Sequence, residues 1–270
     1  MRWKRKADEK ATIPLIVKFN NFLWVLASGF VEALKGADTV EKKEKNPFVD
    51  LSTASRKAPR PEMEKMVRKH ALITTIIVDV GEVQITGWDV GKRLEPILKT
   101  SDTQILKKLA GDDLRAFFIG SMTEEEFWKR VITRNEWPID VATLKKAVRE
   151  SFREVEGTRE ILEKLRLHGF KLGLISNHGK EWVEYISKKF DYHMLFHSTL
   201  YSFEVAMSKS DKRMYKILLE KLGSKPEECL FIDDQEKNIA IAKELGMKTI
   251  LFKDAERLRH DLISLGINLN

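Results

Sequence analysis

The sequence is poor in cysteine, because its 270 residues include only Cys229. A single cysteine excludes an intramolecular disulfide and a cysteine-rich zinc site, and it fits a reducing compartment. Cys229 begins the apolar run Cys-Leu-Phe-Ile, where we expect a buried, inert thiol rather than a nucleophile. Thiol-based redox chemistry is therefore not a function that we predict for this chain.

The sequence also lacks a long uninterrupted apolar run. The longest candidate lies within residues 13–35, after a basic start, and it is interrupted by Lys18, Asn20 and Asn21. These polar side chains make the run too broken to predict a transmembrane span. Membrane contact by residues 13–35 stays open as an alternative, either as a signal-like segment or as one lying on the membrane surface. The other interpretation is an amphipathic helix that rests on the body of the protein.

Residues 1–70 differ from the rest of the chain in composition. A polar stretch punctuated by proline and serine follows the apolar run and is typical of a linker. We predict that residues 1–70 form a basic, partly disordered N-terminal extension. A translation start at Met63 or Met66 is an alternative. We expect a cytoplasmic protein, with membrane association or targeting through the extension as the alternative.

The body of the chain lacks an excess of either charge. The formal net charge is +7, and residues 1–70 hold 16 Lys and Arg against 9 Asp and Glu, which accounts for all of it. Residues 71–270 therefore carry no net positive charge that would attract a polyanion. We expect no nucleic-acid partner, and the sequence does not predict an oligomeric state.

From residue 71 onward, apolar runs alternate with amphipathic ones. The strand-like runs end at Asp79, at Ser176, near His197, at Asp233 and at Phe252. Helical patterns lie between the later runs, over residues 158–168, 181–190, 212–222 and 235–245. This alternation is typical of βαβ units and of a parallel sheet covered on both faces. We predict an α/β fold with a doubly wound, mostly parallel, Rossmann-like sheet.

One stretch, residues 87–156, breaks the alternation and shows no strand signal. It contains helical segments such as "QILKKLAGDDLRAFF", "TEEEFWKRVITRNEW" and "DVATLKKAVRESFREV". The second opens with Thr123 followed by Glu126, which indicates a capping box. We predict a helical insertion at 87–156, between core segments 71–86 and 157–270.

Polar residues gather where the predicted strands end, and ligands bind beyond the carboxyl ends of strands in open α/β sheets. Alone, each has an ordinary interpretation as a helix cap, a turn residue or a solvated charge. Together they supply a carboxylate nucleophile, a hydroxyl, a lysine and an acidic pair, as phosphoryl transfer through an aspartyl-phosphate requires. Oxygen ligands without a His/Cys cluster suit Mg²⁺ better than zinc. The residues concerned are Asp79, Ser176, Asn177, Lys209, Asp233 and Asp234.

The order and local context of these residues resemble the haloacid-dehalogenase-like hydrolase superfamily. "IIVDVGEV" is similar to its first motif, in the subgroup with glycine two residues after the nucleophile, and "LGLISNHG" is similar to the second. "SFEVAMSKSDKRMYKILLEKLG" resembles the third motif and "CLFIDDQEKNIAIAKELGMKTILF" the fourth. The resemblance covers about residues 71–270, and it implies that the helical insertion is a small cap domain that closes over the site and selects the substrate.

The resemblance implies a role for each matching residue. Asp79 would be the nucleophile and a Mg²⁺ ligand, and Gly81 would give its backbone carbonyl to the metal. Asp234 would ligate the metal with Asp233 close behind, whereas Asn238 would orient a ligand or water.

The same resemblance assigns the phosphoryl group to three further residues. Ser176 and the backbone amide of Asn177 would hold its oxygens. Lys209 would bridge the charges of the nucleophile and the phosphate.

Several residues depart from the family pattern. Most phosphatases of the superfamily carry a second aspartate at the position of Gly81, as general acid and base, which is help worth roughly 10²–10⁴ in rate. Glu82 is the nearest spare carboxylate, but we expect its side chain to point away from Asp79. Ser210 replaces the usual proline after the lysine, which loosens that turn. His178 is a candidate for substrate contact, with a role at the surface or in packing as the alternative.

Two tryptophans lie in or beside the predicted cap. We interpret Trp88 and Trp128 as packing residues. One aromatic residue facing the site would nevertheless be ordinary for substrate selection.

Three functions follow from these residues. The leading hypothesis is a Mg²⁺-dependent phosphatase of a small phosphorylated metabolite, such as a sugar phosphate, acting through Asp79. The second is dehalogenation by attack of Asp79 on carbon, which needs no metal and which the pair Asp233 and Asp234 disfavours. The third is a catalytically weak or inactive protein that works as a binding module.

Overall fold

A computed structural model describes residues 72–87 and 90–269. The predictions for residues 1–70, including membrane contact by residues 13–35, and for Trp88 lie outside the described residues. From Ile73 onward, the described chain belongs to one compact unit. Among the helices that the structure describes, none is both long and apolar enough to cross a membrane.

A five-stranded sheet forms the centre of this unit, in the order β5-β4-β1-β6-β7. Every neighbouring pair in it is parallel, which confirms the predicted α/β class. The strands are β1 Thr75–Val78, β4 Lys171–Ser176, β5 Ser198–Tyr201, β6 Cys229–Asp233 and β7 Lys248–Leu251.

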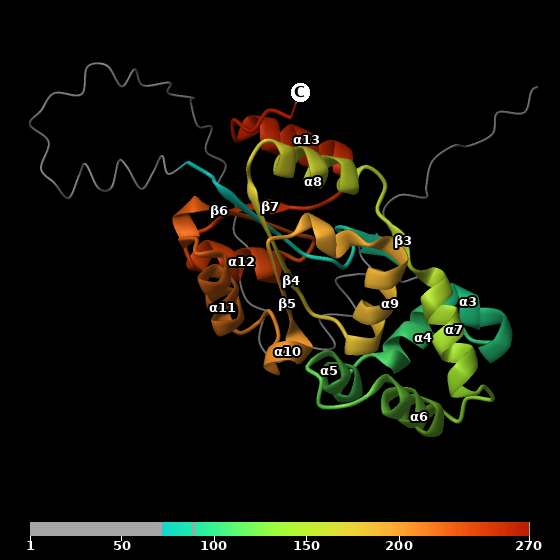
Figure 1. The fold of residues 1–270 in the computed structure, drawn as a ribbon. Helices are drawn as coiled ribbons and strands as arrows, with labels where there is room; N and C mark the ends of the chain where they lie inside the picture. The colour runs from blue at the N-terminus through green and yellow to red at the C-terminus, as the bar shows by residue number, and fades with distance from the viewer. Residues whose placement is uncertain (1–71, 88–89, 270) are drawn as a thin grey trace, which may run out of the picture. The chain divides into compact units, whose positions relative to one another are not determined.

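Helices cover both faces of the sheet because the strands are apolar on both sides. In β1, Ile76 and Val78 pack into one core cluster and Ile77 packs into the other. Figure 1 shows α8 and α13 side by side on the first face, with α11 and α12 gathered on the second. Their bounds are α8 Thr158–Leu167, α13 Ala255–Ser264, α11 Lys212–Leu222 and α12 Glu236–Glu244.

The predicted strand "YHMLFHS" before His197 was wrong. Helix α9, Lys180–Phe190, ends at Asp191 in the left-handed region, with φ 48°. A 3-10 turn, η2 Tyr192–Leu195, follows, and the strand begins only at Ser198. The apolar and aromatic residues from Tyr192 to Phe196 made the turn resemble a strand, because a short apolar run alone does not distinguish the two.

The stretch between the first and second sheet strands is mostly helical, as predicted. Its helices are α3 Val90–Leu98, α4 Asp102–Leu109, α5 Asp112–Phe118, α6 Glu124–Asn135 and α7 Val141–Ser151. The capping box is confirmed, because Thr123 accepts from the Glu126 backbone and Glu126 accepts in return.

Two details of this stretch were wrong in the sequence prediction. The segment 104–118 is two helices rather than one, since Gly111 has φ 120° and interrupts it. A short antiparallel ribbon, β2 Ile85–Thr86 with β3 Arg153–Glu154, also closes the two ends of the insertion. Strands of two residues are too short for a periodic signal, so the pattern could not reveal them.

The helical stretch packs against α9 through a shared apolar cluster and a buried carboxylate. The ring of Phe117 meets that of Trp182 edge-on, with centroids 5.0 Å apart. Glu124, 1% exposed, accepts hydrogen bonds from the indoles of Trp182, 3.0 Å, and Trp128, 3.3 Å. The two terminal nitrogens of Arg149 also donate to the Glu124 carboxylate, at 3.0 and 2.7 Å. Trp128 is thus a packing residue, as predicted.

Two short segments complete the described chain. Helix α10, Ser202–Val205, follows β5, and the 3-10 turn η3, Pro226–Glu228, leads into β6. Cys229 at the start of β6 is buried, which confirms the prediction for it, and burial raises the pKa of its thiol to about 12.

Candidate active site

The site is built at the carboxyl edge of the sheet, around Asp79. Strand β1 lies between β4 and β6, so the residues that end these three strands must meet. The Asp79 amide continues the ladder by donating to the Ile232 carbonyl at 3.0 Å. One oxygen of its carboxylate, Oδ1, accepts from the Val80 amide at 2.7 Å. The backbone of Asp79 is therefore held by β6, and its carboxylate is held by the amide of Val80.

Lys209 joins two of the carboxylates. Its Nζ lies 2.5 Å from Oδ2 of Asp79 and 2.7 Å from Oδ2 of Asp233. The lysine is 1% exposed. Burial lowers its pKa, but the negative charges of Asp233 and Asp79 outweigh this and raise the pKa above its ordinary value. The ammonium is therefore held in its charged form between the two acids.

Ser176, at the end of β4, links Asp79 to His178. Its hydroxyl donates to Oδ1 of Asp79 at 2.7 Å, and its oxygen lies 2.9 Å from Nδ1 of His178. His178 is 3% exposed, and burial lowers the pKa of its imidazole to about 4. The sequence had given His178 little weight, yet the structure places it in direct contact with Ser176.

The loop that carries Lys209 is tied to the end of β4. The side-chain oxygen of Asn177 accepts from the Lys209 amide at 2.9 Å. The hydroxyls of Ser208 and Ser210 lie 2.6 Å apart, and the Asp211 amide donates to the Ser208 carbonyl at 2.9 Å. These bonds close the turn that the missing proline at position 210 was expected to loosen.

Asp233 and Asp234 follow β6 and differ in their partners. Asp233, fully buried, accepts from Lys209, from the Gln235 amide at 2.8 Å and from the side chain of Asn238 at 2.9 and 3.1 Å. Asp234 accepts at 2.7 Å from the side-chain amide of Gln235, which is neutral. Burial, together with the charge of Asp79, raises the pKa of Asp233 to about 6. Burial and the charge of Asp233 raise the pKa of Asp234 well above its ordinary value.

Three carboxylates converge here in a way that suits a cation. One ligand atom from each of Asp79, Asp233 and Asp234 lies within 4.8 Å of the others. Lys209 supplies one positive charge against three potential negative ones. Carboxylate oxygens are the ligands that Mg²⁺ prefers. The donor set therefore fits a hard divalent cation.

The chain turns sharply after Asp79. The amides of Gln84 and Ile85 both donate to the Val80 carbonyl at 2.9 Å, and Glu82 sits in the left-handed region with φ 56°. Glycine or asparagine is less strained in such a turn. Because the Glu82 carboxylate accepts from the Thr86 hydroxyl at 2.8 Å, it is held by its own loop.

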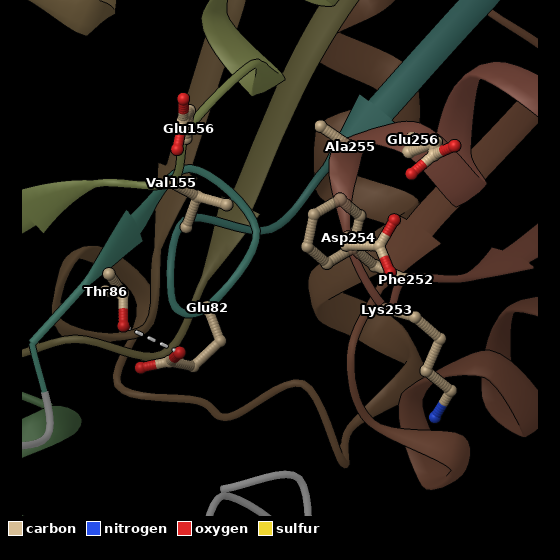
Figure 2. A pocket seen from close by; sticks show the side chains of 9 residues that line it. All are labelled: Glu82, Thr86, Val155, Glu156, Phe252, Lys253, Asp254, Ala255 and Glu256. Carbon is tan, nitrogen blue, oxygen red and sulfur yellow. Dashed lines mark hydrogen bonds between the residues drawn. The ribbon is translucent and has the colours of Figure 1, made fainter. Parts of the chain in front are cut away.

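Glu82 lines a pocket of about 620 Å³ between this loop and the start of α13. Figure 2 shows Glu82 and Thr86 on one wall and the segment from Phe252 to Glu256 on the other. Besides Glu82, the lining includes the acids Glu156, Asp254 and Glu256 and one cation, Lys253. With four acids and one lysine, this wall is unfavourable for a phosphate.

Some residues of the site were not found from the sequence. Gln84 donates to the Asp79 carbonyl at 2.8 Å, and Ser202 accepts from the His178 amide at 3.1 Å. Lys237, half-buried on α12, has its pKa lowered to about 7 by burial and by the charge of Lys209. Gln84 and Ser202 act through single hydrogen bonds across the fold, which leave no periodic signal in the chain.

Comparison with known proteins identifies the family of the chain. The family model for haloacid dehalogenase-like hydrolases matches residues 94–252, which is more than half of the chain. The chain belongs to the haloacid dehalogenase-like hydrolases. The matched span includes Ser176, Lys209, Asp233 and Asp234 and begins after Asp79, so Asp79 joins the site through the parallel pairing of β1 with β4 and β6.

Two curated relatives are, by name, a nucleotide hydrolase and a phosphatase. The chain is 29% identical over 151 residues to flavin mononucleotide hydrolase 1 of Arabidopsis thaliana, covering 56% of this chain and 61% of the relative. It is 32% identical over 113 residues to glyceraldehyde 3-phosphate phosphatase of Pyrococcus furiosus, covering 41% and 46%. In both cases the match spans less than two thirds of the relative's own length.

A solved structure shares the fold of this haloacid dehalogenase-like protein. A HAD family enzyme of Bacteroides thetaiotaomicron, in complex with magnesium and inorganic phosphate, superimposes with a TM-score of 0.58. The match covers 70% of this chain and 98% of that one at 24% identity. This confirms the doubly wound fold expected from the sequence.

Proposed function

We propose that this hydrolase is a phosphatase that acts on a small phosphorylated metabolite through an aspartyl-phosphate on Asp79. The observation that carries the proposal is the placement of Lys209. Its ammonium touches the would-be nucleophile while Ser176 donates to the other oxygen of the same carboxylate. A nucleophile flanked by a cation and a hydroxyl is arranged to receive a phosphoryl dianion.

The chain's own residues account for the first step. A carboxylate oxygen of Asp79 forms a bond to phosphorus as the bond from phosphorus to the ester oxygen breaks, and the leaving alkoxide takes the electron pair. Ser176 and the backbone amide of Asn177 would hold phosphoryl oxygens, and Lys209 would neutralise their charge. The transfer would take place at the carboxyl edge of the sheet, where these side chains meet.

Asp79, the carbonyl of Gly81, Asp234 and, close behind, Asp233 would hold Mg²⁺. When bound, the ion would neutralise the surplus carboxylate charge and that of the phosphate. Asn238, bonded to both oxygens of Asp233, orients that carboxylate rather than replacing an acid. The magnesium named for the Bacteroides enzyme supports this assignment.

Residues 87–156 would act as the cap that selects the substrate. The flavin nucleotide and the triose phosphate named for the two relatives support a small phosphorylated substrate rather than a macromolecule. The acidic pocket beside Glu82 disfavours a second anionic group on that side.

The test is phosphate release from a panel of phosphomonoesters that includes flavin mononucleotide, glyceraldehyde 3-phosphate and sugar phosphates, with Mg²⁺ or EDTA. Activity should require the metal and should be lost in Asp79→Asn. Asp112→Asn, at an exposed position on α5, is the matched control and should stay active. Activity that survives EDTA or the Asp79 substitution would sink the proposal.

The same assay separates the other hypotheses. Halide release without metal would indicate dehalogenation. Mg²⁺ binding without turnover of any ester would indicate a binding module, which the absence of an acid at position 81 favours. Loss of partner or membrane association in a variant beginning at Met63 would place that binding function in the extension.

The location of the protein is also a proposal. The single cysteine fits a reducing compartment such as the cytoplasm. The chloroplast named for the Arabidopsis relative supports the alternative that residues 1–70 carry a targeting signal. Fusing residues 1–70 to a fluorescent protein tests this, since diffuse fluorescence would favour the cytoplasm.

A further inference from the structure

Gly81 and His178 lie against each other at the edge of the site. A Cβ atom added to Gly81 would meet the Cε1 atom of His178 at 3.4 Å, with no other described heavy atom within 4 Å outside the adjoining residues. The imidazole therefore stands beside the position from which an acidic side chain at residue 81 would project.

The hydrogen bonds fix which imidazole nitrogen carries the proton. The single hydroxyl proton of Ser176 goes to Oδ1 of Asp79, because a carboxylate can only accept. The 2.9 Å contact between Ser176 Oγ and His178 Nδ1 then requires Nδ1 to be the donor. In the neutral ring, Nε2 is left as an acceptor. Nε2 is bonded to Cε1, so it lies on the ring edge that faces Gly81.

The ring is held firmly in this place. The His178 amide donates to the hydroxyl oxygen of Ser202, and that hydroxyl donates to the Phe118 carbonyl at 2.5 Å. The Phe118 ring stacks on the imidazole with centroids 6.1 Å apart. The next residue, Gly179, lies so close to Phe117 that an added Cβ would be 1.9 Å from the ring. Cap and core together thus determine where Nε2 lies.

Among the described residues, Nε2 has no hydrogen-bond partner. A firmly held acceptor beside the nucleophile is suited to a water molecule. Burial keeps the ring neutral, which agrees with an accepting Nε2.

We propose that His178, through Nε2, holds the water molecule that hydrolyses the aspartyl-phosphate, in the place of the side chain that Gly81 lacks. The inference rests on the proposed phosphatase function. The water oxygen forms a bond to phosphorus, the bond from phosphorus to the Asp79 oxygen breaks, and the electron pair returns to the carboxylate. Both water protons leave on the dihydrogen phosphate, so the step balances without another acceptor. The role of His178 is to aim the water.

The experiment is rapid-quench kinetics of His178→Ala with a phosphomonoester that the wild type hydrolyses. Phosphorylation of Asp79 should keep its rate, and dephosphorylation should slow by about 100-fold, because misplacing an attacking group costs about that much. The phosphoenzyme should accumulate, and kcat and KM should fall together while kcat/KM stays near the wild-type value. Exposed His168→Ala is the control and should change neither step.

Three further variants keep the test decisive. His178→Phe preserves the ring packing against Phe118 but removes Nε2, and it should show the same accumulation even if the alanine variant folds poorly. In His178→Ala/Gly81→Asp, the aspartate side chain occupies the space left by the imidazole, and kcat should be at least tenfold higher than in His178→Ala. His178→Ala/Gly81→Ala should restore none.

Three outcomes would overturn the inference. They are dephosphorylation at the wild-type rate in both single variants, slowing confined to phosphorylation, and no recovery with the aspartate. A wild type that turns over esters without a phosphoenzyme would instead overturn the proposed function, so the two failures are told apart.

Discussion

The molecule buries carboxylates in two regions, and the partners of these carboxylates differ between the two. In the helical region, Glu124 accepts from Arg149 and from the indoles of Trp128 and Trp182. At the sheet edge, Asp79 and Asp233 share the ammonium of Lys209, and Asp234 turns to a neutral amide. We refer to these as the Glu124 cluster and the Asp79 cluster.

The difference lies in how far each charge is compensated. The Glu124 cluster pairs one acid with one guanidinium and adds two neutral donors, so charge and hydrogen bonds are both balanced. The Asp79 cluster has more acid than Lys209 neutralises, and the raised pKa values of Asp233 and Asp234 report the surplus. We interpret the balanced pair as structural and the surplus as the mark of the candidate cation site.

The largest expected effect comes from removing the cation of the Asp79 cluster. Lys209→Met should lower kcat/KM by about 10³-fold or more, because a preorganised charge on the phosphoryl group is lost. Phosphate release assays measure it, with exposed Lys212→Met as control. A loss of less than tenfold would mean that Lys209 serves structure, as Arg149 does.

Breaking the Glu124 cluster should affect stability instead. Arg149→Met leaves a buried carboxylate unpaired and should lower the free energy of unfolding by about 3 kcal/mol, measured in urea. Adding Glu124→Gln should recover part of that loss. If Arg149→Met lowers kcat/KM of the folded protein as strongly as Lys209→Met does, the distinction between the clusters fails.

The buried imidazole beside the Asp79 cluster should destabilise the protein in acid. Its pKa falls from the ordinary 6.5 to about 4 on folding, so the folded state binds fewer protons than the unfolded state between these values. The contribution of His178 to the free energy of unfolding is therefore fully present above pH 6.5. It falls by about 3 kcal/mol as the pH drops to 4.

His178→Gln should remove most of this loss of stability between pH 6.5 and pH 4. His168→Gln, at an exposed position, should leave the loss unchanged. Urea titrations in EDTA across this range measure both. If the free energy of unfolding varies with pH in the same way for His178→Gln and the wild type, another group controls the loss of stability in acid.

The smallest effect is the response to the cation itself. If the folded Asp79 cluster binds Mg²⁺ as proposed, a concentration 100-fold above the dissociation constant should stabilise the protein by about 2.7 kcal/mol. Calorimetry measures the shift in Tm. Arg149→Met should keep the shift and Asp234→Asn should lose most of it; equal shifts in both would place the cation elsewhere.

The sequence predicted the parts of this molecule that leave a local pattern. The strand ends at Asp79, Ser176 and Asp233 were visible because apolar runs stop there at a polar residue, and parallel pairing then brings them together. The strand near His197 was misplaced because the apolar and aromatic run from Tyr192 to Phe196 has the composition of a strand. The β2–β3 ribbon was missed because two-residue strands have no period.

The contacts of His178 could not be predicted, for a different reason. His178 contacts Gly81, almost a hundred residues earlier, and also Ser202 and Phe118, which lie on separate elements. Each of these contacts joins segments that are far apart in the sequence. No spacing within the chain encodes such a meeting, so the residue looked like an ordinary loop histidine.

The close approach of Gly179 to Phe117 has an evolutionary consequence. Gly179 has φ −70°, a conformation open to any residue, so its restriction is one of space alone. Phe117 cannot yield, because Phe127 and Trp182 pack on it with ring centroids 5.4 and 5.0 Å away. A larger residue at 179 is therefore tolerated only after a smaller one appears at 117. In a mutational library the two positions should show strong epistasis, and diversification of the helical region would be constrained by the loop that it covers.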